Sequence, residues 1–145
     1  MAIIGDSGAV YGLYDRRDAF HAGLRAAIER ARDVIVLPAP TLGEIDYLLR
    51  VRLGNPALLR FLADIQEGAF VVESVTLADL RRCAALIARY RDLDLGLSDA
   101  SVVAVAERAQ RALRDCLTHA NAMIPVCRRS MSKWRSRRPR NVCGR

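Results

Sequence analysis

Three acidic residues stand where the chain is expected to leave a strand or to begin a helix. Asp6 follows a short apolar run, Glu44 comes soon after a second run at residues 34–37, and Asp99 opens a late helix. The working site of an open parallel sheet lies outside the carboxyl ends of its strands, so such a fold can gather these side chains. Carboxylates without a basic partner need a cation to share a pocket, and oxygen ligands suit Mg²⁺ or Mn²⁺. The pattern therefore predicts a divalent-metal site.

Each acid also has a purely structural interpretation. Thr41 and Glu44 have the spacing of a helix capping box. Asp99 can complement the dipole at the start of its helix, and Asp6 can accept hydrogen bonds in a turn or a cap. For any one acid taken alone the structural interpretation is favoured, so the metal interpretation depends on all three acting together.

Short apolar strands alternate with helical patterns over most of the chain. Strands are predicted at residues 3–4, 34–37 and 70–72, and helices at 9–14, 16–32, 41–53, 56–67, 77–91 and 98–110. Phe20 begins the apolar stripe of the helix at 16–32. The helix at 77–91 is expected to bury Leu80, Ala84, Ile87 and Tyr90.

Strands separated by helices indicate an α/β domain with a parallel sheet. We predict an α/β/α sandwich whose central parallel sheet has four or five strands, with the first strand in the middle. A further strand should follow the helix at 98–110, although residues 111–117 make a poor one. The domain is expected to cover residues 1–125, and an Arg-rich tail at 126–145 to be disordered.

The charge of the protein is concentrated in its tail. The chain has 145 residues and a formal net charge of +7, but residues 128–145 contain eight basic groups and no acid, which leaves the rest at −1. A basic surface over the whole domain, the usual footprint for nucleic acid, is not indicated. Cys83 is the only cysteine before residue 116, which favours a reducing compartment. No apolar run approaches the roughly 20 residues of a membrane helix, so a soluble, cytoplasmic protein is expected.

Several enzyme classes are excluded by what the sequence lacks. The only lysine is Lys133, in the tail, which excludes a P-loop enzyme and disfavours a phospho-receiver domain. No G-x-G-x-x-G motif is present for a dinucleotide. His21 and His119, the only histidines, form no credible Ser/His/Asp set.

Three blocks of sequence carry a family resemblance. They are GDSGAV at residues 5–10, EIDYLL at 44–49 and YRDLDLGLSDASVVAVAER at 90–108. Together they resemble the signature blocks of PIN-domain ribonucleases, and more closely those of the VapC toxins of bacterial toxin–antitoxin pairs. The resemblance covers roughly residues 2–110, and its last block is the most specific.

The resemblance implies a metal-dependent ribonuclease. The family's metal-binding acids match Asp6, Glu44 and Asp99, and the hydroxyl beside its metal site matches Ser7. The implied reaction is hydrolysis of an RNA phosphodiester with Mg²⁺ or Mn²⁺ as the cofactor. The implied partners are the RNA substrate and a VapB-like antitoxin, with homodimerisation and no membrane. The apolar helix surface of Leu48, Leu49, Leu58, Leu59 and Leu62 also favours a protein partner, although a tight core explains it equally well.

The sequence departs from the family after residue 110. The family continues with a strand that ends in a Thr-x-Asp turn, whereas this chain reads Leu117-Thr118-His119-Ala120-Asn121. The fourth acid is missing unless Asp115 replaces it three residues early. A change of reading frame in the gene would produce such a loss of pattern. The alternative function is therefore a weakened or inactive PIN relative that only binds antitoxin or nucleic acid.

Overall fold

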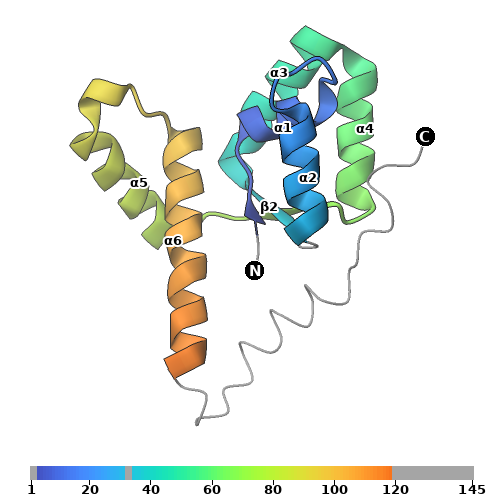
Figure 1. Ribbon diagram of the computed structural model, residues 1–145. Helices are drawn as coiled ribbons and strands as arrows, with labels where there is room; N and C mark the ends of the chain where they lie inside the picture. The colour runs from blue at the N-terminus through green and yellow to red at the C-terminus, as the bar shows by residue number, and fades with distance from the viewer. Residues whose placement is uncertain (1–2, 32–33, 119–145) are drawn as a thin grey trace.

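Three strands and six α-helices alternate along residues 3–31 and 34–118, the ranges that the computed structural model describes (Figure 1). Two short 3-10 helices, η1 and η2, lie among them. The elements are β1 (Ile3–Ile4), α1 (Ser7–Tyr14), α2 (His21–Ala31), β2 (Ile35–Pro38), η1 (Ala39–Thr41), α3 (Leu42–Leu53), α4 (Asn55–Gln66), β3 (Phe70–Glu73), α5 (Leu77–Arg89), η2 (Arg91–Leu93) and α6 (Leu97–Thr118).

The strands form one parallel sheet in the order β1-β2-β3. Ile4 is paired with Val36 of β2, and Val36 with Val71 of β3. The predicted α/β class and parallel sheet are thus confirmed. Within the described residues β2 is the middle strand and β1 an edge. The predicted fourth or fifth strand and the central position of β1 are not seen within those residues, and the chain after residue 118 lies outside them.

Helices cover the two sides of the sheet. Figure 1 shows α1 to α4 on one side and α5 with α6 on the other. Because side chains alternate along a strand, Ile35 and Leu37 of β2 share a face, and both belong to the larger core cluster with Phe61 of α4. Val36 points to the opposite face, and α6 packs against β2. Both faces of β2 are therefore buried, as its unbroken apolar run predicts.

The face that α5 buries differs from the predicted one. We expected Leu80, Ala84, Ile87 and Tyr90 to be buried, but Leu80 and Tyr90 are each 40% exposed, Ala84 is exposed and Ile87 is only half-buried. The helix instead buries Asp79, Cys83 and Leu86. Cys83 and Leu86 pack against Ala100 and Ala104 of α6.

Helix α6 is longer than predicted. It continues to Thr118 through the segment at 111–117, where a poor strand was expected. Residues 97–118 contain no glycine or proline to stop it. At 1.5 Å per residue its 22 residues extend about 33 Å. Asp115 lies within this helix, whereas the tail at 126–145 and the boundary at 125 lie outside the described residues.

The predicted leucine surface is partly core. Leu49 is fully buried, and Leu48 and Leu58 are half-buried, whereas Leu59 and Leu62 of α4 are exposed. The tight-core interpretation thus holds for α3, and of these five leucines only Leu59 and Leu62 are exposed. No helix within residues 3–31 and 34–118 is long and apolar enough to span a membrane.

Candidate metal site

Asp6 connects the end of β1 to the start of α1. Its backbone is extended, and its Oδ1 accepts a hydrogen bond of 2.6 Å from the backbone N–H of Ala9. Asp6 is therefore the N-cap of α1, one of the roles that the sequence suggested. The side chain remains exposed. One oxygen holds the helix start, and a carboxylate has lone pairs left for another ligand.

Glu44 lies in the first turn of α3 and does not complete a capping box. Thr41, the N-cap residue, makes no side-chain cap; its hydroxyl donates to the carbonyl of Pro38 at 2.8 Å. The capping-box interpretation is therefore wrong, because Thr41 is fully buried and is used to close the η1 turn. Glu44 is exposed, and its side chain makes no hydrogen bond or ion pair with another residue of the described ranges.

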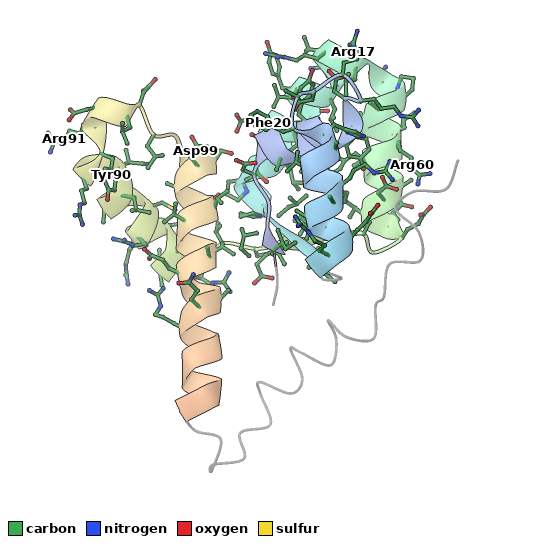
Figure 2. The ribbon with its side chains drawn as sticks, in the orientation of Figure 1. Arg17, Phe20, Arg60, Tyr90, Arg91 and Asp99 are labelled. Carbon is green, nitrogen blue, oxygen red and sulfur yellow. The ribbon has the colours of Figure 1, made fainter. Side chains whose placement is uncertain are left out.

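Asp99 lies in the first turn of α6, where a negative charge complements the helix dipole. Its side chain is exposed, and within residues 3–31 and 34–118 it has no hydrogen-bonding or ion-pairing partner. The neighbouring polar residue is used differently, since the Ser101 hydroxyl is buried and donates to the Ser98 carbonyl at 2.6 Å. Figure 2 shows Asp99 near the top of α6.

The fold brings together the elements that carry the three acids. Asp6 follows β1, Glu44 follows β2 through η1, and α6 packs against β1, β2 and η1. All three acids thus belong to elements that meet around the carboxyl ends of β1 and β2. In the rotamers that they adopt, however, the described His, Cys, Asp and Glu side chains form no group of three that could hold a metal ion. The shared site remains a prediction at the level of side-chain contact.

The two accessory residues are placed unequally. Ser7 is the first residue of α1 and is buried directly beside Asp6 in the chain. Asp115 lies 16 positions after Asp99 on α6, which separates them by about 24 Å along the helix axis. The accessory role of Asp115 stays a prediction.

An apolar cavity of about 330 Å³ adjoins Asp6. It lies along β1 between α2 and α6, and Asp6 is its only ionisable lining residue. Neither Glu44 nor Asp99 lines it. Asp6 is therefore the only one of the three acids that the cavity shares with the proposed metal site. The sequence had indicated no cavity here. Its lining is Ile3, Ile4, Gly5, Asp6, Ala9, Val10, Leu13, Leu24, Ala27, Ile28, Ile35 and Val102.

The segment between α1 and α2 is a second feature that the sequence reasoning missed. Phe20 was assigned to the buried stripe of a helix at 16–32, but α2 begins at His21 and Phe20 is 73% exposed. The missed signal is the Asp-Arg-Arg-Asp sequence at 15–18, whose acids favour turns over a continuous helix.

Comparison with known proteins adds a family match. The PIN domain family model matches residues 3–113, which include all three acids. Among curated proteins the chain is similar to ribonuclease VapC26 of Mycobacterium tuberculosis, with 28% identity over 125 residues that cover 83% of this chain and 91% of the relative.

A solved structure supports the fold. The crystal structure of Mycobacterium tuberculosis VapC20, described as a Sarcin-Ricin loop cleaving toxin, superposes with a TM-score of 0.67 at 22% identity. The match covers 76% of this chain and 84% of that one.

Proposed function

This chain belongs to the PIN-domain family, and from that premise we propose that it is a metal-dependent endoribonuclease toxin held in check by a cognate antitoxin. The observation that carries the proposal is the family match over residues 3–113, within which Asp6, Glu44 and Asp99 fall on elements that meet at one edge of the sheet. Relatives support the reaction class, because VapC26 is named a ribonuclease and VapC20 a Sarcin-Ricin loop cleaving toxin.

The donor set fits a hard divalent cation, Mg²⁺ or Mn²⁺. All three candidate ligands are exposed carboxylates, and Glu44 and Asp99 have no competing partner among the described residues. Oxygen ligands of this kind are those that both ions prefer. When bound, such a cation offsets charge on the phosphoryl oxygens and promotes deprotonation of the attacking water.

The chain's own residues position the reaction. The Asp6 carboxylate is oriented by its bond to the Ala9 N–H, which limits the rotation of its second oxygen. Ser7 is the first residue of the same helix. Because Ser7 is buried, its position next to Asp6 is fixed. Without a cation, three carboxylates at one edge would repel an RNA phosphate, so phosphate binding should depend on metal.

The proposed partners follow from the same family. A VapB-like antitoxin and an RNA substrate are the expected partners, and the exposed Leu59 and Leu62 of α4 give apolar surface for a protein contact such as a homodimer. RNA and antitoxin both place the expected site of action in the cytoplasm.

The test combines metal binding with RNA cleavage. Purified wild-type protein should cleave a single-stranded RNA in Mg²⁺ or Mn²⁺ and not in EDTA, and calorimetry should detect metal binding. Asp99→Asn and Glu44→Gln should lose both properties while retaining the wild-type circular dichroism spectrum. Glu67→Gln, at an exposed carboxylate at the end of α4, is the matched control and should retain both. Metal binding that survives Asp99→Asn would overturn the assignment of the site.

The alternative function, an inactive relative that binds antitoxin or nucleic acid, gives a different result in the same experiment. It retains binding of RNA or of the antitoxin but shows no metal-dependent cleavage in the wild-type protein. The departure of the sequence after residue 110 is the observation that favours it.

A further inference from the structure

We infer that Phe20 is a stacking platform for an unpaired RNA base, flanked by the arginines of the α1–α2 loop, residues 15–20. The inference rests on the proposed function, since it concerns how the same protein holds single-stranded RNA beside the acidic edge, the three acids Asp6, Glu44 and Asp99 around the carboxyl ends of β1 and β2. It assigns an RNA-binding residue outside the three acids.

The first argument is the exposure of the Phe20 ring. Phe20 is the most exposed of the large hydrophobic residues in the described ranges, at 73%. Leu24, one turn later in α2, lines the apolar cavity, so the helix has its own core contact without Phe20. A ring this exposed leaves most of its surface available for stacking on a base.

The second argument is that the backbone on both sides of Phe20 is fixed. Its N–H donates to Asp18 Oδ1 at 2.8 Å, and its carbonyl accepts from the Leu24 N–H at 2.9 Å. The Asp18 N–H donates to the Asp15 carbonyl at 3.0 Å. The ring is therefore presented from a hydrogen-bonded turn, which lowers the entropy lost when a base binds.

The third argument is that the acids of the loop are hydrogen-bonded, whereas its arginines are exposed. Both acids are used internally: Asp15 is buried and accepts from the Tyr11 hydroxyl at 2.7 Å and the Arg17 N–H at 3.0 Å, and Asp18 accepts from Phe20. The Tyr11 bond, together with Arg17, holds the pKa of Asp15 below its usual value, although desolvation opposes them. The Arg17 side chain is 84% exposed even though its Nε contacts Asp15, and Arg16 is exposed.

A formally neutral loop thus presents guanidinium groups and one aromatic ring to solvent. That combination is typical of single-stranded nucleic-acid binding, in which bases stack on aromatic rings and arginines contact phosphates. Figure 2 shows Phe20 near the start of α2 and Asp99 near the start of α6, both toward the upper end of the molecule in this view. A strand held at the acidic edge can therefore place a neighbouring base on Phe20.

The experiment uses full-length protein that keeps all three acids, with Ca²⁺ in place of Mg²⁺ so that a cation is bound without supporting cleavage. The probe is a single-stranded RNA that contains 2-aminopurine, whose fluorescence falls on stacking. Phe20→Leu keeps an apolar side chain without a π face, and Phe20→Trp keeps the face. We expect Phe20→Leu to weaken affinity about 5- to 150-fold and to remove the quenching, and Phe20→Trp to retain both. Arg17→Gln should weaken binding and lower the log–log salt slope by about 0.7.

The matched control is Tyr90→Leu. Tyr90 is also an exposed aromatic residue, but the Arg89 guanidinium already lies over its ring, 5.4 Å from the centroid. It should change neither affinity nor quenching. In the cleaving protein, Phe20→Leu should raise KM and leave kcat within about twofold, because stacking is equal in the ground and transition states.

Two outcomes overturn the platform. One is wild-type affinity and quenching in Phe20→Leu; the other is intact RNA binding in that variant with loss of antitoxin binding, which would make Phe20 a protein-docking residue. Stacking on Phe20 without metal-dependent cleavage in the wild-type protein would support the platform and contradict the proposed nuclease, so the two failures are distinguishable.

Discussion

Asp6 has two roles that can be separated by substitution. It caps α1 through its bond to the Ala9 N–H, and it is a candidate metal ligand at the end of β1. Glu44 and Asp99 have no such structural bond among the described residues. The three acids therefore contribute differently to stability even though one reaction would need all of them.

We expect Asp6→Ala to lower the free energy of unfolding by about 1 kcal/mol, because Ala cannot cap α1. Asp6→Asn should keep the wild-type stability, since Asn caps as well as Asp, and yet lose cleavage with the charge. Urea denaturation with parallel cleavage assays measures both effects, and Glu44→Gln provides a variant with no cap to lose. Equal stability of Asp6→Ala and wild type would show that the cap contributes nothing.

At the scale of elements, the α5–α6 pair also contains an acid with two roles. Asp79 completes the capping box of α5 with Thr76 and also receives the Arg108 guanidinium of α6 at 3.1 Å. Arg108 further contacts Glu73 at the end of β3, and Arg82 forms a bidentate pair with Glu107. The outer helix pair is thereby joined to the sheet through charged groups.

The buried Asp79 should make the protein less stable in acid. Burial raises the pKa of this carboxyl, but the Thr76 hydrogen bonds and the Arg108 charge outweigh it and leave the pKa below its usual value. Because the folded pKa is lower than the unfolded one, the stabilisation is present above about pH 4 and is lost as the pH falls through the folded pKa.

We expect Asp79→Asn to cost about 1–2 kcal/mol at pH 7 through the lost charged hydrogen bonds. The difference from wild type should shrink as the pH falls through the lowered pKa of the folded Asp79 carboxyl. Denaturant titrations across this range measure it, with Glu67→Gln as the control. A difference that does not change with pH would contradict the assigned role of the Asp79 charge.

The sequence predicted best those elements whose limits are set by one local signal, such as an apolar run or a Gly or Pro stop. The apolar run at 34–37 and the Gly and Pro stops around α4 placed β2 and α4 to within a residue or two. The face of α5 could not be predicted in this way. Its buried face includes the charged residue Asp79, whose partner Arg108 lies 29 positions away in the chain. A hydrophobic pattern cannot predict such a pair.

The candidate site was predictable only in part, for a similar reason. Order and spacing identified three acids on elements that do meet. The sequence could not show that Thr41 bonds to Pro38 and leaves Glu44 free, because that depends on how η1 turns. Nor could it show that the acids of the α1–α2 loop accept hydrogen bonds from the backbone of the same loop, which is a property of the folded loop.

At the scale of the whole molecule, charge is separated along the chain. Residues 128–145 carry eight basic groups and no acid, whereas the preceding residues sum to −1. Cationic groups of this density add affinity for any RNA by releasing counterions, without sequence preference.

We expect five to eight phosphate contacts by residues 128–145 to give a log–log salt slope of about −3.5 to −5.6 for single-stranded RNA. Deletion after Val126 should reduce both the affinity and the slope, and replacing the eight basic residues by Gln should have the same effect at full length. Binding measured between low and moderate salt provides the test. An unchanged slope would show that the tail is inert, and loss of folding on deletion would move the domain boundary.

The distribution of the acids along the chain has a consequence for synthesis. Asp6 and Glu44 leave the ribosome early, but Asp99 opens the last described helix and is followed by 46 more residues. At about 5–20 residues per second those residues take roughly 2–9 seconds to translate. A nascent chain lacks one of the three proposed ligands until Asp99 has been translated, so the proposed nuclease cannot act before that point. The proposed antitoxin therefore has time to be made before the proposed site is complete.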